Sequence, residues 1–384
     1  MKLFHLFSYY RGRRAPLSNG ARGTISLSAI LLVILLLAAG CNSERQSADR
    51  GEEATNIILF IGDGMGVAHV TAAMTVAGGD LHMTSMPYAG LVTTDAYENY
   101  VTDSAAGATA IASGIKTRNG MLGMSPDTIP VISLFNIAKE AGLATGIVST
   151  CRVTHATPAA FFANNESRRN GEEIAADMLN GAADLFFGGG LDHFTQRADG
   201  RDIVKELEEM GYTIARSADE IDILEKLPVG GLFYEGHMPK ASEGRSVSLK
   251  EMTGKALDLL SENKNGFILM VEGSMIDWGG HDNDTDYIVS ETLDMDEAVG
   301  VALDFAERNP GTLVLVASDH ETGGMVLTGG SRSGQRVVAR YATTGHSATM
   351  VPLFSAGTAA GNFTGVMDNT DLFHRMISAL GLDN

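Results

Sequence analysis

Several residues that could bind metal ions or attack a substrate stand directly behind apolar segments of the chain. In chain order they are Asp63, Ser104, Glu272, Asp277, His281, Asp319, His320 and His346. A lone histidine is usually structural, but three histidines and four acids that follow successive apolar runs favour a functional interpretation. Carboxylate and imidazole groups that converge in this way predict a site for metal ions.

Ser104 stands at the start of an Ala-rich segment that reads as a helix. Thr102 or Asp103 would cap this helix, and Gly114 would end it. The backbone N–H groups and the dipole of the first turn would then favour an anion beside Ser104. A serine at this position could be an ordinary capping residue. The acids and histidines found elsewhere favour a nucleophile instead.

Two segments imitate other ligand-binding motifs. Asp63 lies in a glycine-rich run that resembles a dinucleotide fingerprint, but the third glycine, Gly66, comes one position too early. A metal-binding acid therefore fits Asp63 better. Residues 282–286 imitate a calcium loop, yet Tyr287 and Leu293 occupy the positions that require glycine and glutamate. We interpret this second segment as solvated and partly helix-capping.

The elements that must position these residues alternate between strands and helices. Continuous apolar runs predict strands at residues 56–61, 143–148, 184–187, 266–271, 312–317 and 351–355. Helical patterns lie at residues 131–140, 202–210, 249–262 and 288–307. This alternation predicts an α/β fold, a three-layer sandwich with a large, mostly parallel central sheet flanked by helices. Ligands of such sheets bind at the carboxyl ends of the strands, where the candidate residues fall.

The segments that carry the last histidines are less regular. Asp277 and His281 could share one helical face, but Gly279 and Gly280 between them favour a turn. His346 lies in a loop with a glycine kink. In either arrangement, Asp277 and His281 can converge on one ion.

The N-terminal segment predicts export. Residues 1–40 combine a basic lead-in with an apolar run at residues 30–37, which is shorter than the roughly 20 residues that span a bilayer. Small residues then lead to Cys41, a pattern that resembles a bacterial lipoprotein signal with a lipid on the cysteine sulfur. Residues 41–54 form a polar, flexible tether in this interpretation, and residues 55–384 form the catalytic domain. The protein would be periplasmic or at the cell surface, anchored to the membrane by the lipid on Cys41 rather than by a spanning helix.

Charge and cysteine usage exclude some alternatives. The formal net charge of −19 becomes about −24 without residues 1–40, which argues against nucleic-acid binding. An anionic substrate remains compatible, since bound metal ions can reverse the local sign of the charge. With Cys41 used for the lipid, Cys151 has no partner for an intrachain disulfide. Cys151 could be a nucleophile, but a small buried core residue is the favoured interpretation.

The chain resembles the alkaline phosphatase family from about Ala54 to the C-terminus. The resemblance depends on Asp63 in Gly-Asp-Gly-Met-Gly, Asp103-Ser104-Ala105, His155-Ala-Thr157-Pro-Ala, Glu272-Gly with Asp277 and His281, Asp319-His320, and Gly345-His346. It implies one zinc ion held by Asp277, His281 and His346. It implies a second zinc ion held by Asp63, Asp319, His320 and the Ser104 oxygen, and a magnesium ion held by Asp63, Thr157 and Glu272.

The same resemblance assigns the substrate-binding residues. Arg168 would grip the phosphate, and Asp103 would lie behind the site. His155 and Trp278 stand where one well-known branch of the family has aspartate and lysine. They could be packing residues or could tune the magnesium site.

The chemistry that the resemblance implies is consistent with these residue types. Nitrogen and carboxylate ligands suit zinc, whereas an all-oxygen set of Asp, Thr and Glu suits magnesium. Four carboxylates against three divalent cations leave the net positive charge that a phosphate dianion requires. Two nearby metal ions would clamp the attacking and leaving oxygens of an in-line displacement. Ser104 would attack as an alkoxide and form a phosphoserine, which water then hydrolyses.

The expected substrates are small phosphate monoesters. Only 25 residues separate His320 from His346, which leaves no room for a large capping insertion and predicts an open site. A homodimer is possible, because the family is commonly dimeric. Two alternatives remain: a related metal-dependent phosphodiesterase or sulfatase, and a non-catalytic surface lipoprotein that binds metal or phosphate. The segment after Ser104 lacks the Pro and Arg of a sulfatase motif, and the binding lipoprotein predicts a lost ligand that this chain does not show.

Overall fold

The protein, seen in a computed structural model that describes residues 53–383, is built around a ten-stranded sheet. Each strand runs parallel to its neighbours except β13, which runs antiparallel to both β2 and β8. The order across the sheet is β14 (Gly365–Asp368), β2 (Tyr88–Thr93), β13 (Val351–Gly357), β8 (Thr312–Ala317), β1 (Asn56–Gly62), β7 (Phe267–Gly273), β3 (Ala144–Arg152), β4 (Leu185–Gly189), β6 (Val229–Tyr234) and β5 (Thr213–Ala215). The predicted α/β sandwich with a mostly parallel sheet is confirmed.

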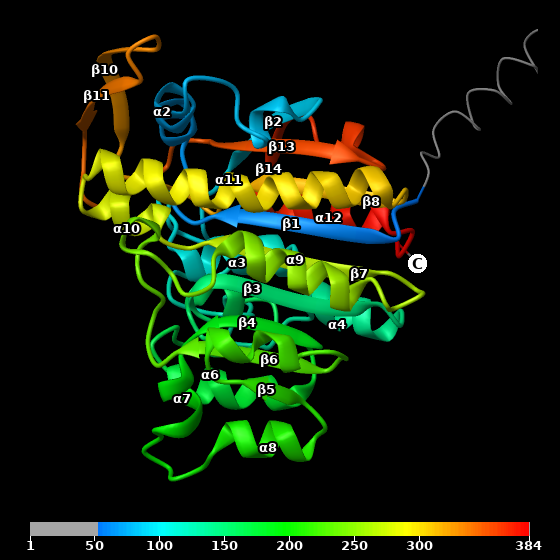
Figure 1. Cartoon of the computed structure of the whole chain (residues 1–384). Helices are drawn as coiled ribbons and strands as arrows, with labels where there is room; N and C mark the ends of the chain where they lie inside the picture. Colours follow the sequence, from blue (N-terminus) through cyan, green and yellow to red (C-terminus); the bar gives the residue numbers. More distant parts are fainter. Residues whose placement is uncertain (1–52, 384) are drawn as a thin grey trace, which may run out of the picture. The chain divides into compact units, whose positions relative to one another are not determined.

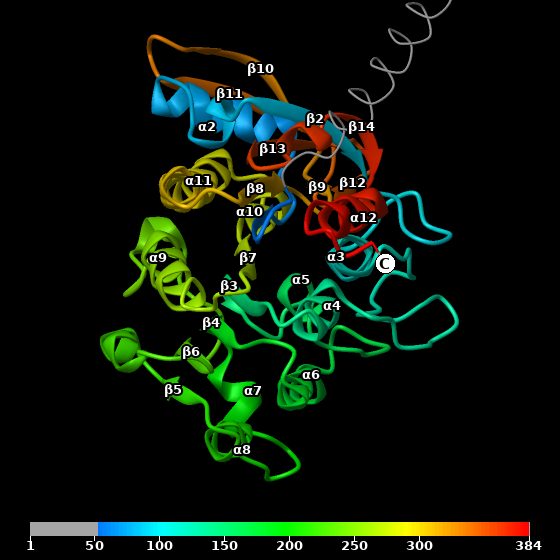
Figure 2. The ribbon, with the colours of Figure 1, turned by 90° about the vertical axis from the view of Figure 1, so that its right-hand side faces the viewer.

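Helices cover both faces of this sheet (Figures 1 and 2). One face carries α2 (Val67–Ala77), α9 (Leu249–Leu260) and α11 (Thr285–Arg308). The other carries α3 (Ser104–Ser113), α4 (Leu134–Glu140), α5 (Ala156–Ala159), α6 (Gly171–Asp177), α7 (Leu191–Thr195), α8 (Ile203–Glu209) and α12 (Asn369–Ala379). The short α10 (Ile276–His281) follows β7 directly. The described chain is therefore three layers deep.

The alternation of side chains along β1 shows why the central strands are apolar throughout. Ile57, Leu59 and Ile61 pack into the hydrophobic core on the α3 side. Ile58 and Phe60 pack into the separate core on the α11 side. Because both faces are covered, a central strand has no solvent face that would accept polar residues.

Two small ladders extend from the carboxyl end of β8. β10 (Met325–Ser331) and β11 (Arg336–Tyr341) form a hairpin. β9 (Glu321–Thr322) pairs with β12 (His346–Ser347), which places His346 opposite Thr322. The predicted loop at His346 is thus a short paired strand, and its pairing fixes the histidine beside the segment that follows β8.

The predicted elements are present with shifted ends. All six predicted strands exist, and five of them extend beyond the apolar run, as β3 does to Arg152. The helix predicted at residues 131–140 begins only at Leu134, because Ser133 caps it. The helix predicted from residue 288 begins at Thr285, because Asp284 caps it. The sequence did not predict β2, β5, β6, β14 and the small ladders, which are short, polar or glycine-rich.

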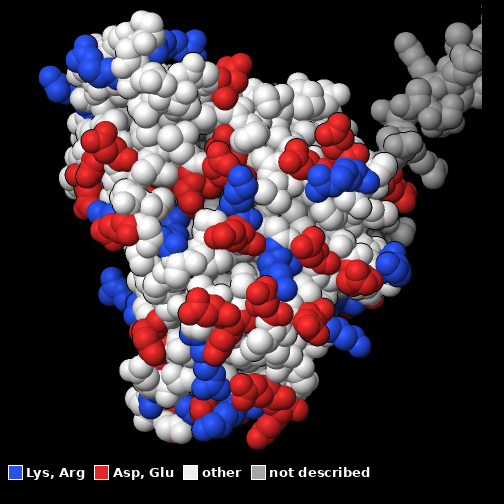
Figure 3. All heavy atoms as spheres, in the orientation of Figure 1, with Lys and Arg blue, Asp and Glu red and all other residues white. Residues whose placement is uncertain are grey.

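Three further observations concern the charged surface, membrane-spanning helices and the N-terminal segment. Figure 3 shows acidic and basic side chains alternating over one face of the molecule. Within residues 53–383, no helix combines the length and the apolar character that a bilayer crossing requires. The predicted signal segment, residues 1–40, and the lipidation site Cys41 lie outside the described residues.

Candidate active site

Three neighbouring strands bring distant acids to one edge of the sheet. β1 lies between β8 and β7, and Ile61 is in register with Ala317 on one side and Glu272 on the other. Asp63 and Asp319 follow their strands by one or two residues, so all three carboxylates meet at the carboxyl ends of the strands. Asp63, Glu272 and Asp319 are all completely buried.

Ser104 begins α3 above this edge. Asp103 is the N-cap and accepts a hydrogen bond from the backbone N–H of Ala106 at 3.0 Å. Gly114, in the left-handed conformation with a φ of 70°, ends the helix as predicted. The Oγ atom of Ser104 lies 3.1 Å from Nε2 of His320 and 3.5 Å from Oδ1 of Asp63. The hydroxyl therefore sits within the cluster of acids and histidines.

The first cluster, which we call the histidine group, consists of Asp277, His281 and His346. The carboxylate of Asp277 lies 3.3 Å from Nε2 of His281 and 3.5 Å from Nε2 of His346. Burial opposes ionisation of Asp277, but hydrogen bonds from the two histidines hold its pKa well below the usual range. The hydrogen bond to Asp277 raises the pKa of His281 to about 9. One ligand atom from each residue lies within 4.8 Å of the others, as a shared metal ion requires.

The predicted turn between Asp277 and His281 is wrong, because α10 runs through both glycines as a helix. A Cβ at Gly279 would lie 2.8 Å from the backbone nitrogen of Ile288. A Cβ at Gly280 would lie 2.9 Å from Thr322. The glycines therefore permit close packing of α10 rather than a turn, and the helix places residues four apart on one face.

His320 connects Ser104 to the acids at the centre of the site. Its Nε2 atom lies 3.4 Å from Oδ1 of Asp63 and 3.3 Å from Oδ2 of Asp319. Burial lowers the pKa of His320 well below its usual value, which keeps the imidazole neutral and able to bind a metal. The backbone N–H of Gly64 donates to Oδ1 of Asp319 at 3.2 Å. Asp63, Asp277 and His320 also offer ligand atoms within 4.8 Å of one another.

The second cluster, which we call the acid group, consists of Asp63, Thr157 and Glu272. The Thr157 hydroxyl lies 3.4 Å from Oδ2 of Asp63. Oε2 of Glu272 accepts hydrogen bonds from Ser274 at 2.7 Å and from Cys151 at 3.2 Å. Burial raises the pKa of Glu272 to about 7 and the pKa of Asp63 well above its usual value. The donor atoms of the acid group are oxygens.

The residues present fit the divalent cations that the sequence predicted. Among the described residues, Oε1 of Glu272 and Oδ2 of Asp319 are buried without a hydrogen-bond partner. Buried carboxylates that face one another with unpaired oxygens are costly unless cations compensate them. Imidazoles, carboxylates and a hydroxyl are also the donor types that zinc and magnesium take.

Arg168 closes the other side of the site. Its guanidinium reaches Oδ2 of Asp103 at 3.1 Å and Nε2 of His155 at 3.3 Å. The backbone N–H of Gly120 donates to the same Asp103 oxygen at 3.0 Å. Arg169, the adjacent residue, is exposed. Arg168 is thus the arginine held beside Ser104, and Asp103 orients it while capping α3.

Two hydroxyl residues contact the clusters without having been predicted, and a further histidine lies against Trp278. The hydroxyl of Thr322 donates to Asp277, and Ser274 donates to Glu272. Both hydroxyls lie within two positions of a predicted ligand, and this proximity in the sequence could have identified them. The ring of His237 lies 4.8 Å from that of Trp278, and nothing in its sequence neighbourhood points to the site.

The family model for alkaline phosphatase matches residues 54–342. The chain belongs to the alkaline phosphatase family. Alkaline phosphatase 4 of Bacillus subtilis is 36% identical over 85% of this chain and 73% of its own length. The alkaline phosphatase of Escherichia coli is 33% identical over 86% of each chain. As a member of this family, the protein is a phosphoric monoester hydrolase.

Solved structures of the family share the fold. The alkaline phosphatase of the Antarctic bacterium TAB5 aligns with a TM-score of 0.82 and 36% identity, covering 87% of this chain and 100% of that one. A variant of the TAB5 enzyme, with a histidine replaced by glutamate, has magnesium bound in its M3 site.

Proposed function

We propose that the protein hydrolyses small phosphate monoesters through a phosphoserine on Ser104, with two zinc ions and one magnesium ion. The observation that carries the proposal is the position of the Ser104 hydroxyl. It lies at the N-terminus of α3, 3.1 Å from His320 and 3.5 Å from Asp63. A serine held among metal-ligand types, beside an arginine, is suited to attack a phosphate.

The proposed ligand sets follow the clusters. Three residues of the histidine group would hold one zinc ion: Asp277, His281 and His346. The second zinc ion would be held by Asp63, Asp319, His320 and the oxygen of Ser104. The acid group would hold magnesium: Asp63, Thr157 and Glu272. The magnesium of the TAB5 variant supports a magnesium site in this family.

The chain's own residues carry the steps. Ser104 Oγ attacks phosphorus in line with the ester oxygen, the P–O bond to the alcohol breaks, and the alcohol leaves. Water then attacks the same phosphorus, releases inorganic phosphate and restores the serine. When bound, the two zinc ions supply Lewis-acid chemistry that lowers the pKa of the attacking hydroxyls and neutralises the departing alkoxide.

Arg168 binds the substrate in this proposal. A guanidinium can hold two non-bridging phosphate oxygens at once, and Asp103 already fixes its plane through Nη1. The four carboxylates of Asp63, Glu272, Asp277 and Asp319 balance four of six cationic charges, so an anionic substrate is attracted. His155 and Trp278 lie behind the site and would tune the magnesium ion or pack against it.

We extend the proposal to location and organisation. Residues 1–40 would be removed as a lipoprotein signal, residues 41–54 would be a tether, and residues 55–384 would be the catalytic domain. The enzyme would then act in the periplasm or at the cell surface, anchored by a lipid on Cys41. The homodimer common in the family is proposed for this chain as well.

The proposal includes an open site with low selectivity for the leaving alcohol. Between His320 and His346 the chain forms only β9 and the β10–β11 hairpin. No larger domain is inserted there that could cover the substrate.

The deciding experiment compares an aryl phosphate monoester with the matching diester, before and after EDTA and after zinc and magnesium are restored. We expect fast monoester hydrolysis that chelation abolishes and the metals restore. Preference for the diester would overturn the substrate class while keeping the metals. Zinc binding without hydrolysis of either ester would indicate a binding protein.

A further inference from the structure

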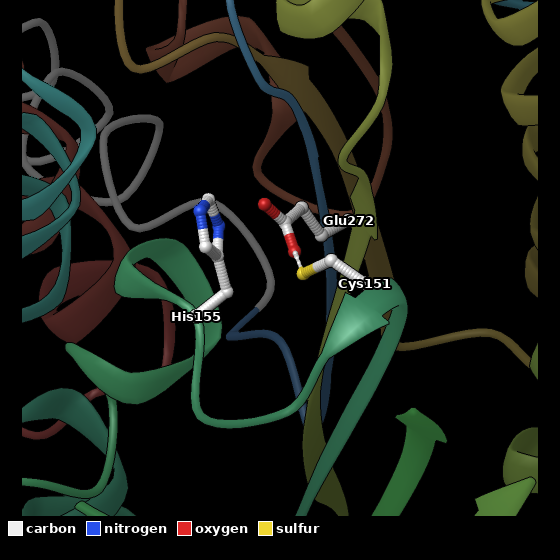
Figure 4. A group of neighbouring side chains, drawn as sticks. All are labelled: Cys151, His155 and Glu272. Atoms are coloured by element: carbon white, nitrogen blue, oxygen red, sulfur yellow. Dashed lines mark hydrogen bonds between the residues drawn. The ribbon is translucent and has the colours of Figure 1, made fainter. Parts of the chain in front are cut away.

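Cys151 lies beside the acid group and was not needed by the proposed reaction. It is a free, fully buried thiol near the end of β3. Its S–H donates to Oε2 of Glu272 at 3.2 Å, across 121 residues of sequence (Figure 4). The sequence predicted a small core residue, and the structure adds this direct contact to a proposed metal ligand.

His155 completes a group around the same carboxylate. One ligand atom each from Cys151, His155 and Glu272 lies within 4.8 Å of the other two. Figure 4 shows the carboxyl group of Glu272 between the sulfur and the imidazole. Among the described residues, Oε1 of Glu272 and Nδ1 of His155 are buried without hydrogen-bond partners. Two buried polar atoms of this group therefore have no hydrogen-bond partner in the described part of the protein, and a bound cation would satisfy them.

We propose that Cys151, His155 and Glu272 form a site for a thiophilic divalent cation, zinc or cadmium, which competes with magnesium for Glu272. This inference rests on the proposed role of Glu272 in the magnesium site. Binding forms a sulfur–metal bond with the lone pair of Cys151, and the thiol proton passes to solvent. No oxidant or further reactant is needed.

The two cations would use different donors around one shared carboxylate. Sulfur, nitrogen and carboxylate oxygen form a set that zinc and cadmium accept, whereas magnesium prefers oxygen alone. Magnesium would take Glu272 with Asp63 and Thr157. Because Glu272 serves both sets, occupation of one excludes the other, and excess zinc would displace magnesium through Cys151.

Cobalt(II) is the probe for the test, since a thiolate bound to it gives a charge-transfer absorption band that nitrogen and oxygen ligands do not give. The whole chain is stripped of metals and titrated with cobalt(II) without substrate. We expect the band in the native protein and in Cys41→Ser, which removes the only other cysteine. We expect no band in Cys151→Ala.

Each other outcome overturns the inference. Absence of the band from the native protein, its persistence in Cys151→Ala or its loss in Cys41→Ser would show that Cys151 is not a ligand. Thr157→Val is the matched control for the oxygen set, and it should keep the band while weakening magnesium binding. In competition, Cys151→Ala should require at least about tenfold more zinc to displace magnesium. The absorption band is measured without turnover, so the two proposals can fail separately. Absence of the band would not contradict monoester hydrolysis, and absence of hydrolysis would not contradict cobalt binding by Cys151.

Discussion

The histidine group and the acid group each contain a buried carboxylate, Asp277 and Glu272, whose pKa values are shifted in opposite directions. Asp277 accepts hydrogen bonds from two imidazoles, which keep its pKa low although it is buried. Glu272 is equally buried, but its partners are a hydroxyl and a thiol, and its pKa rises to about 7. The protein itself therefore supplies positive charge to one cluster, whereas the other cluster depends on a bound cation.

The difference extends to solvent access. The side chain of His281 is 40% exposed, whereas Glu272 is fully enclosed. A cation in the histidine group can be reached directly from solvent. A cation in the acid group is shielded, so its electrostatic contribution is stronger.

The largest expected effect comes from the hydroxyl that lies between the two clusters. Ser104→Ala should lower turnover by at least about 10³-fold and abolish the phosphoenzyme, because it removes the attacking oxygen. Metal content and acid-trapped phosphoprotein are measured together. Ser113→Ala, at the other end of α3, is the control and should retain the phosphoenzyme. A phosphoprotein in Ser104→Ala would contradict the proposed nucleophile.

The pH dependence of the free energy of unfolding of the metal-free protein tests the contrast between the two clusters. In the folded state the pKa of Glu272 is about 7, above its ordinary 4.5, so folding favours the protonated form. The free energy of unfolding should fall as pH rises from about 4.5 to 7, by on the order of 3 kcal/mol. Glu272→Gln should make this decline shallower in urea titrations at several pH values, whereas Asp319, whose pKa burial also raises to about 7, should maintain part of it.

The matched variant in the histidine group should behave in the opposite way. The pKa of Asp277 is lowered in the folded state, so its stabilising effect is present above its ordinary pKa of 3.8 and is lost as pH falls through the lower folded value. Asp277→Asn should therefore destabilise the metal-free protein at neutral pH. Equal responses of the two variants would contradict the contrast between the clusters.

A smaller effect is expected on the substrate side. Arg168→Lys should lower kcat/KM for an aryl phosphate about 10- to 100-fold, since a lysine cannot hold two oxygens in the fixed plane of a guanidinium. Arg169→Lys changes the exposed neighbour and should leave kcat/KM unchanged. Inhibition by inorganic phosphate should weaken only in the first variant. Similar losses in both would reject Arg168 as the phosphate-binding residue.

The smallest predicted change concerns the identity of the cation in the acid group. His155→Asp replaces a nitrogen donor with oxygen, and magnesium affinity should rise about tenfold because magnesium prefers oxygen ligands. Titration of activity with magnesium measures the change. Unchanged affinity would mean that His155 only packs beside the site.

Sequence reasoning predicted the features that local pattern encodes. The apolar run of β1 ends at Asp63, and the cap of α3 precedes Ser104, so both residues could be placed at element ends. The helix through Gly279 and Gly280 could not be predicted, because close packing against Ile288 and Thr322 outweighs glycine's low helix propensity. Local propensity does not contain that contact.

Contacts between residues far apart in the sequence were the second feature that the sequence could not predict. The Cys151–Glu272 hydrogen bond joins residues that are 121 positions apart, and no periodic pattern in the sequence predicts it. The same holds for His237 beside Trp278. The strand β6 escaped prediction because Gly230 and Gly231 interrupt its apolar run, although a Cβ at Gly230 would meet Phe186 at 2.3 Å.

The strand order at the centre of the sheet also determines when this enzyme can mature. Gly64 and its partner Asp319 are 255 residues apart, and His346 reaches back 244 residues to Thr102. Such long-range closure makes folding slow. Asp63 and Ser104 are synthesised early, yet a nascent chain that ends before β12 lacks His346 and cannot complete the histidine group. Capture of the full set of metals would therefore report that nearly the whole chain has been synthesised and folded.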